Sequence, residues 1–272
     1  MSAPTLLPAR RVTALNDAER SENAIHHDDV ARRYGFGGGL VPGVTVYAYM
    51  SALPAEHWGA AWVQRGTMTA RFVQPVYDGE EIEVRAWVAD GGGLALEVRG
   101  PDGVVRATGA AGLPPTPTPP PDLAGFAVTG LPEPAARPPA SEQVLSTVRL
   151  GTFDRRWYAA EQPAFLRSVG EDPGAWPLPS VAHPGWLIRG ANDVLSRSVR
   201  LGPWMHVSSD TVHHRPVGDG ALVSARGRVE ALYERKGHRF VELDVVLLAD
   251  DELVWSIRHV AIYQLRPVAA PG

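Results

Sequence analysis

The stretch RFVQPVYDGEEIEVRAWV at residues 71–88 returns later in the chain as VHHRPVGDGALVSARGRV at residues 212–229. Both contain Pro-Val-x-Asp-Gly followed by an extended run that ends in valine. A second match lies upstream, where VPGVTVYAYMSAL (41–53) aligns with HPGWLIRGANDVL (183–195). The two matches are offset by 141 and 142 residues, respectively. This agreement in order and spacing indicates two copies of one structural unit.

Each copy is predicted to contain one helix followed by antiparallel strands. Pro-Gly suits a helix start, and the apolar residues after it have helical spacing. Asp-Gly and Lys-Gly pairs between the apolar runs are typical of hairpin turns. Strands are expected at residues 67–74, 81–90, 93–100 and 103–112, and at 205–213, 221–233, 237–249 and 252–265. The pattern predicts an α+β fold in which an antiparallel sheet wraps each apolar helix.

The two copies are separated by a proline-rich segment at residues 113–139. Proline fixes φ and has no N–H donor, so this segment cannot form a helix interior or a central strand. We therefore predict an N-terminal domain at residues 1–112, a linker at 113–140 and a C-terminal domain at 141–272.

The composition is that of an ordinary folded protein. Of 272 residues, 44% are hydrophobic and 21% are charged, and the formal net charge of −4 argues against broad nucleic-acid binding. The absence of cysteine excludes disulfides, thiolate metal sites and a cysteine nucleophile. The N-terminus lacks the apolar core of a signal peptide, and no run approaches the ~18 apolar residues that span a bilayer. We expect a cytoplasmic protein that binds neither nucleic acid nor membrane.

The stretch SENAIHHDDVARRYGFGGGLVPG at residues 21–43 carries a motif. It resembles the signature of MaoC-like (R)-specific enoyl-CoA hydratases: Gly-Asp-x-Asn-Pro-hydrophobic-His-x-Asp, then alanine, Gly-Phe, and a His-Gly pair that opens the central helix. The matching residues are Asn23, Ile25, His26, Asp28, Ala31, Gly35, Phe36 and Gly43. The resemblance implies a double hotdog fold, that is, two tandem units each with a sheet around a central helix.

The chain departs from this signature at several positions. Ser21 stands where the family has its catalytic aspartate, with Glu22 adjacent, and Pro42 stands where it has the histidine before the helix glycine. In the second copy, the positions that correspond to His26 hold Arg167 and Ser168. The resemblance therefore implies one altered site, built mainly from the first copy.

The chemistry of hydration gives these residues their expected roles. His26 would be the general acid and base, because a histidine pKa lies near the working pH. Asn23 would orient it, and the N–H groups at the Pro42-Gly43 helix start would stabilise the thioester oxygen. Glu22, or a water held by Ser21, would compensate in part for the missing aspartate. The resemblance implies an acyl thioester of CoA or of a carrier protein as substrate, and no cofactor.

Other interpretations stay open at this point. The same oxyanion site could serve an acyl thioesterase, or the altered motif could mark a non-catalytic acyl-CoA-binding or partner subunit. Asp28 and Asp29 favour the start of a helix by their charge, and a metal site is disfavoured because adjacent helical residues diverge by about 100°. Arg189 and Asn192 share a helix face that is either exposed or in contact with a ligand. Exposed sheet edges are compatible with a homodimer.

Overall fold

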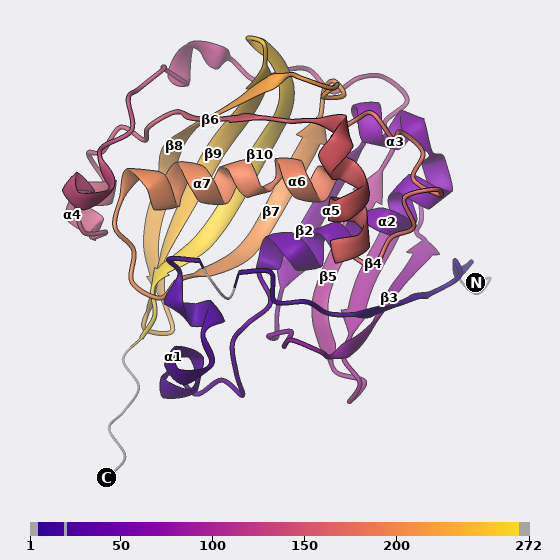
Figure 1. The fold of residues 1–272 in the computed structure, drawn as a ribbon, viewed down its shortest axis with the longest axis horizontal. Coiled ribbons are helices and arrows are strands. Elements are labelled where there is room, and N and C mark those ends of the chain that lie inside the picture. Colours follow the sequence, from indigo (N-terminus) through magenta and orange to yellow (C-terminus); the bar gives the residue numbers. More distant parts are fainter. Residues whose placement is uncertain (1–4, 19–20, 267–272) are drawn as a thin grey trace.

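One continuous antiparallel sheet forms the framework of the computed structural model, which describes residues 5–18 and 21–266. Its strand order is β1-β3-β4-β5-β2-β7-β10-β9-β8-β6 (Figure 1). The first copy supplies the first five of these strands and the second copy supplies the other five. The copies join where β2 (Thr67–Phe72) pairs with β7 (Met205–His213).

The predicted strands are present with ends shifted by a few residues. The remaining strands are β1 (Arg10–Thr13), β3 (Glu81–Val88), β4 (Leu94–Arg99), β5 (Val105–Gly112), β6 (Phe153–Arg156), β8 (Leu222–Arg235), β9 (His238–Ala249) and β10 (Glu252–Gln264). The short edge strands β1 and β6 were not predicted. Asp250 and Asp251, which connect β9 to β10, both have positive φ, as a tight hairpin turn of the right twist requires.

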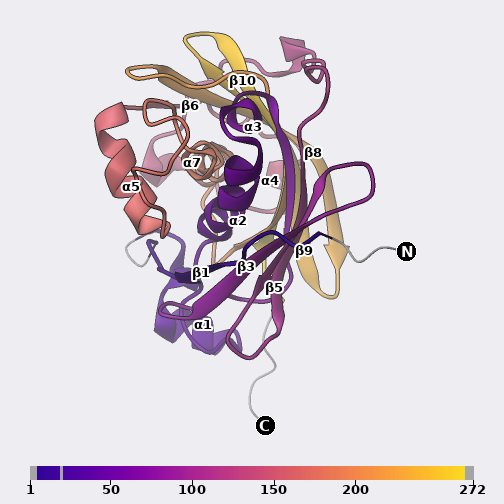
Figure 2. The same ribbon diagram turned by 90° about the vertical axis from the view of Figure 1, so that its right-hand side faces the viewer.

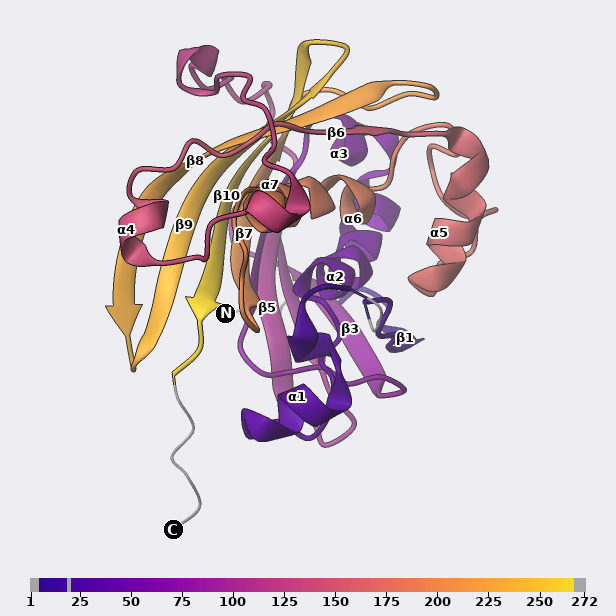
Figure 3. The same ribbon diagram turned by 60° about the vertical axis from the view of Figure 1, so that its left-hand side comes forward.

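The central helices lie on the same face of the sheet (Figures 2 and 3). They are α2 (Gly43–Trp58) in the first copy, and α6 (Pro184–Leu187) with α7 (Arg189–Ser198) in the second. The helix α2 is buried from Val44 to Ala55, which explains why its sequence is apolar on all sides. A Cβ on Gly185 would lie 2.3 Å from the Cβ of Ala48, so glycine is needed where α6 crosses α2.

Shorter helices surround this framework. They are α1 (Asp28–Arg33), α3 (Ala60–Arg65), α4 (Glu142–Leu145) and α5 (Gln162–Ser168), with 3₁₀ turns at Ala24–His26, Leu123–Gly125, Pro134–Ala136 and Ala159–Glu161. The proline-rich segment is helical only in its two 3₁₀ turns, and Arg137 ties it to the second copy by donating to the Ser196 carbonyl. The domain boundaries stay a prediction. Across residues 5–18 and 21–266, no helix is long and apolar enough to cross a membrane.

Candidate functional site

His26 ends the 3₁₀ turn that follows Asn23, and two contacts fix its ring. Its Nδ1 lies 2.6 Å from the carbonyl oxygen of Leu40, and its Nε2 lies 3.2 Å from Nδ2 of Asn23. A carbonyl can only accept, so Nδ1 carries the proton and Nε2 of the neutral ring is the acceptor. The basic nitrogen of His26 thus faces the Asn23 amide.

Asn23 links this histidine to the second copy. Its Nδ2 also donates to the carbonyl of Trp204 (3.0 Å), and its Oδ1 accepts from the Trp204 backbone N–H (3.2 Å). Trp204 directly precedes β7. Asn23 is therefore held by backbone groups on the far side of the junction, which is suitable for the orienting role predicted from the sequence.

The environment of His26 keeps its ring neutral near pH 7. Burial lowers the pKa of His26, and the Leu40 carbonyl and the charge of Asp17 oppose this only in part. A neutral imidazole can accept a proton from water, which is what a general base must do.

An apolar cavity of about 330 Å³ opens beside His26 at the junction of the two copies. We call it the acyl cavity. Both copies supply its walls, which include Ile25, Phe36, Val46, Phe72, Val76, Met205, Phe240, Ile262 and Leu265. Its polar lining includes Asn23, His26, Asn192 and His206. An apolar wall with a few convergent polar groups is typical of a small-molecule site.

A second cavity of about 580 Å³, which we call the arginine vestibule, adjoins the first. The two cavities share Asn23, His26, Pro42, Asn192 and Trp204. The cationic side chains of the vestibule are Arg137, Arg155, Arg189, Arg197 and Arg200, and its acidic ones are Glu22 and Asp193. Burial raises the pKa of Asp193, whose carboxylate lies 3.9 Å from Arg197. The excess of guanidinium groups suits an anionic ligand.

The start of α2 borders the acyl cavity, as His26 does. No side chain caps this end of the helix, because the N-cap residue is Pro42, and both Pro42 and Gly43 line the cavity. A Cβ on Gly43 would lie 2.8 Å from Nδ1 of His206. The space beside the Gly43 Cα is therefore filled by this histidine ring.

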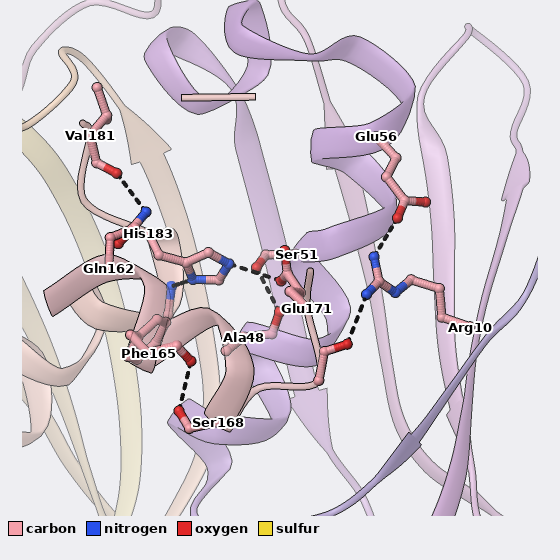
Figure 4. A network of polar contacts seen from close by, with 12 residues as sticks. Arg10, Ala48, Ser51, Glu56, Gln162, Phe165, Ser168, Glu171, Val181 and His183 are labelled. Carbon is pink, nitrogen blue, oxygen red and sulfur yellow. Dashed lines mark hydrogen bonds and ion pairs between the residues drawn. The ribbon is translucent and has the colours of Figure 1, made fainter. Parts of the chain in front are cut away.

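The corresponding helix start in the second copy is closed. Nδ1 of His183 accepts from the Gly185 N–H at 2.9 Å, and its Nε2 lies 3.0 Å from Oε1 of Glu171 (Figure 4). Both side chains are buried against α2. Because this histidine occupies the N–H that a ligand would need, the asymmetry favours a single site in the first copy.

Glu22 and Ser21 line the vestibule rather than the acyl cavity. Glu22 pairs with Arg137 at 2.8 Å, and that hydrogen bond lowers the pKa of Glu22. The Ser21 hydroxyl lies 3.5 Å from the Asn23 carbonyl. Among the contacts of the described residues, neither side chain reaches His26, so the structure does not bring Glu22 or Ser21 beside the histidine.

Asp28 and Asp29 occupy the first turn of α1. They pair with Arg32 (2.7 Å) and Arg33 (2.5 Å), one turn along the same helix. Asp28 also accepts from the Gly39 N–H at 2.8 Å and so holds the glycine-rich loop. Within residues 5–18 and 21–266, no three metal-ligating side chains converge.

Two further polar groups border the site, and only one of them was named from the sequence. Asn192, on α7, borders both cavities, and its Oδ1 has no hydrogen-bond partner in the described part of the chain. It was placed on a helix face with Arg189, which indeed lines the vestibule. His206, on β7, was not singled out at all.

Comparison with solved structures identifies the fold. The chain superposes on RV0216, a conserved hypothetical protein from Mycobacterium tuberculosis with a double hotdog fold, with a TM-score of 0.64 and 15% identity over 96% of both chains. A putative MaoC domain protein dehydratase from Chloroflexus aurantiacus gives 0.61 and 11% identity over 97% of this chain and 95% of that one. A putative thioesterase from Novosphingobium aromaticivorans gives 0.56 and 14% identity over 97% and 100%.

These matches confirm the double hotdog fold expected from the sequence. No protein-family model matches the chain, and no curated protein matches it. Solved structures of this fold include proteins named as dehydratases and proteins named as thioesterases. The fold alone therefore leaves the choice of reaction to the chemistry of the site.

Proposed function

We propose that the chain is a MaoC-like hydratase or dehydratase acting on an acyl thioester of CoA or of a carrier protein. The observation that carries this is the position of His26. Its neutral ring stands beside the uncapped start of α2, between an apolar cavity and an arginine-rich one. A thioester has three parts that match this order: an apolar acyl chain, a polar carbonyl and a phosphate-bearing carrier.

The substrate would lie across the two cavities. The acyl chain fills the acyl cavity, and the thioester carbonyl meets the N–H groups at the start of α2, where the helix dipole favours negative charge. The phosphates reach the arginine vestibule, because one guanidinium group can donate two parallel hydrogen bonds to phosphate oxygens. Asn192, at the shared boundary, offers its unpartnered Oδ1 to an amide N–H of the pantetheine arm.

His26 would move the protons of the reaction. In hydration, water gives its oxygen to the β-carbon and one proton to His26, and the imidazolium then returns a proton to the α-carbon. The enolate oxygen formed in between is stabilised at the start of α2. Because Ser21 replaces the aspartate of the motif and Glu22 pairs with Arg137, we expect a slower reaction than in a site with the full histidine–aspartate pair.

Two further functions share the same geometry. A thioesterase would use the same oxyanion site, with water attacking the carbonyl carbon. A binding or partner subunit would hold the thioester without converting it, and the missing carboxylate favours this reading. Both would bind the thioester at the same place, but the thioesterase would release free thiol and the binding subunit would form no product.

The test measures three signals on one preparation. A hydratase consumes the enoyl-thioester absorbance of crotonyl-CoA and longer enoyl-CoAs and forms the 3-hydroxyacyl product, whereas a thioesterase releases free thiol. A binding subunit does neither but gains thermal stability from acyl-CoA, because a ligand that binds only the native state stabilises it. Release of thiol without loss of the double bond, or binding alone, would overturn the hydratase proposal.

The arginine vestibule gives a separate prediction. Arg200 lines it, is exposed, and makes no side-chain ion pair within the described residues. We expect Arg200→Ala to raise KM for crotonyl-CoA about fivefold, which corresponds to about 1 kcal/mol for an exposed charge contact. KM for crotonyl-pantetheine, which has no nucleotide, should not change. Arg235→Ala, at the exposed end of β8, is the control, and an equal effect on both substrates would contradict the phosphate assignment.

A further inference from the structure

We infer that His206 supplies a second hydrogen-bond donor to the thioester oxygen, beside the N–H groups at the start of α2. This inference rests on the proposed function and assigns a new role at the same site. It concerns a residue of the second copy that lies outside the hydratase-like motif.

A β-bulge points His206 toward the helices. In β7, Ser208 pairs with Val260 and His206 pairs with the next residue of β10, Ala261, so Val207 is the extra residue. In a regular strand, residues three apart face opposite sides of the sheet. The bulge instead puts His206 on the same buried face as Ser209, and such bulges re-aim side chains near functional sites.

His206 reaches the acyl cavity next to the helix start. Its ring lines the cavity, packs edge-to-face against Phe72 with 4.7 Å between ring centres, and abuts Gly43. Because a Cβ on Gly43 would fall 2.8 Å from Nδ1, this nitrogen lies beside the backbone that we assign to the oxyanion. The side chain is 8% exposed.

A hydrogen-bonded chain behind the ring is compatible with a proton on the nitrogen next to Gly43. Nε2 of His206 lies 2.8 Å from the Ser209 hydroxyl, which lies 2.9 Å from Nδ1 of His259. If His259 donates from Nδ1 to the hydroxyl, the hydroxyl donates to Nε2 of His206. The proton of His206 is then on Nδ1, the nitrogen next to Gly43.

Nδ1 of His206 has no hydrogen-bond partner in the part of the chain that the structure describes. A buried polar group without a partner destabilises the fold, so such a group points to a ligand that completes it. Burial, and next the electrostatic influence of the neighbouring His259 ring, hold the pKa of His206 well below its usual range, and the Ser208 backbone opposes them. The ring is therefore neutral and can donate without adding a charge to the cavity.

This donor would act where negative charge develops. When water adds to the β-carbon, electrons move onto the thioester oxygen, and the Gly43 N–H and the His206 Nδ1–H together hold that oxygen. No proton leaves His206. Removing one such donor typically lowers kcat by roughly 10²–10³.

The kinetic test compares two buried histidines of one strand. His206→Phe keeps the aromatic packing and removes the donor, and His213→Phe makes the same change on the same face of β7, outside both cavities. We expect His206→Phe to lower kcat for crotonyl-CoA hydration by about 10²-fold with little change in KM, and His213→Phe to leave kcat within about threefold. Equal losses in both variants, or none in His206→Phe, would overturn the inference.

A spectroscopic test needs no turnover. In protein labelled with ¹⁵N-histidine, the Nδ1 signal of His206 reports its proton and its hydrogen bond. Butyryl-CoA should shift this signal as an N–H donor gains an acceptor, whereas the thioether S-butyl-CoA, which lacks only the carbonyl oxygen, should not. An Nδ1 without a proton, or equal shifts with both ligands, would refute the role of His206. An inactive wild type that still shows the thioester-specific shift would refute hydration and leave the His206 contact standing.

Discussion

Replacing His26 by alanine is expected to lower kcat/KM for crotonyl-CoA hydration by about 10²–10⁴. The substitution removes the one neutral imidazole that faces Asn23 at the junction of the two cavities. The helix start and the arginine vestibule stay in place, so thermal stabilisation by acyl-CoA should persist. The measurement is the loss of enoyl-thioester absorbance in steady state.

The neighbouring histidine provides the control. His27 follows His26 on the same loop but lines neither cavity, so His27→Ala should keep wild-type kcat/KM. The pH profile of the wild type adds a second check. Burial lowers the pKa of His26, so its basic form dominates above pH 6.5 and kcat/KM should fall only as the pH decreases below that value. An active His26→Ala variant with an unchanged pH profile would remove His26 from the mechanism.

The fold could be predicted because its evidence is local and occurs twice. The Pro-Gly helix start and the Pro-Val-x-Asp-Gly turn each occur once in each copy, and the two occurrences are 142 and 141 residues apart, respectively. Each motif marks the beginning of a helix or a turn between strands, because of the backbone conformation that its residues favour. Once two equal units are recognised, one helix and one sheet per unit follow. The pairing of β2 with β7 across the junction could not be predicted, because the sequence of an edge strand does not identify the strand with which it pairs.

The candidate site was predictable where it is contiguous in sequence. Asn23, His26 and Gly43 lie within one stretch, and the structure brings them to one cavity. Glu22 also lies in that stretch, but its partner is Arg137, in the proline-rich segment more than a hundred residues later. Such a long-range ion pair depends on the path of the linker, which composition alone does not define.

His206 was missed for a specific geometric reason. In the strand MHVSSDTVH, simple alternation from the buried His213 puts His206 on the outer face together with Ser208 and Asp210. One extra residue at Val207 reverses that assignment. A bulge without glycine or proline leaves no clear mark in the sequence, so periodicity predicts the wrong face on one side of it.

The buried histidines of this sheet should make the protein acid-sensitive. Burial lowers the pKa of His213 from 6.5 to about 4, and that of His259 to about 3. His213 stacks on Trp255 with ring centres 4.2 Å apart, and its Nδ1 donates to the Trp62 carbonyl. Protonating it in the native state would place a charge on a buried ring that makes no ion pair among the described residues.

The direction in which stability changes with pH follows from how many protons the native and unfolded states bind. Above about pH 6.5, both native and unfolded chains hold a neutral His213, and its contribution to stability is constant. As the pH falls toward 4, the unfolded chain binds a proton that the native chain does not, so the free energy of unfolding decreases. At 1.36 kcal/mol per pKa unit, His213 alone should account for a loss of about 3 kcal/mol, a large part of a typical total of about 5–15 kcal/mol.

Urea unfolding at a series of pH values between 7 and 4 measures this loss. His213→Phe keeps the stacking and cannot bind a proton. Its free energy of unfolding should therefore depend less steeply on pH, with a slope that corresponds to up to one proton fewer, whatever its stability at pH 7. His57→Phe, at an exposed position on α2, should leave the slope as in the wild type. If His213→Phe and the wild type lose stability in parallel, His213 does not stay neutral in the folded protein.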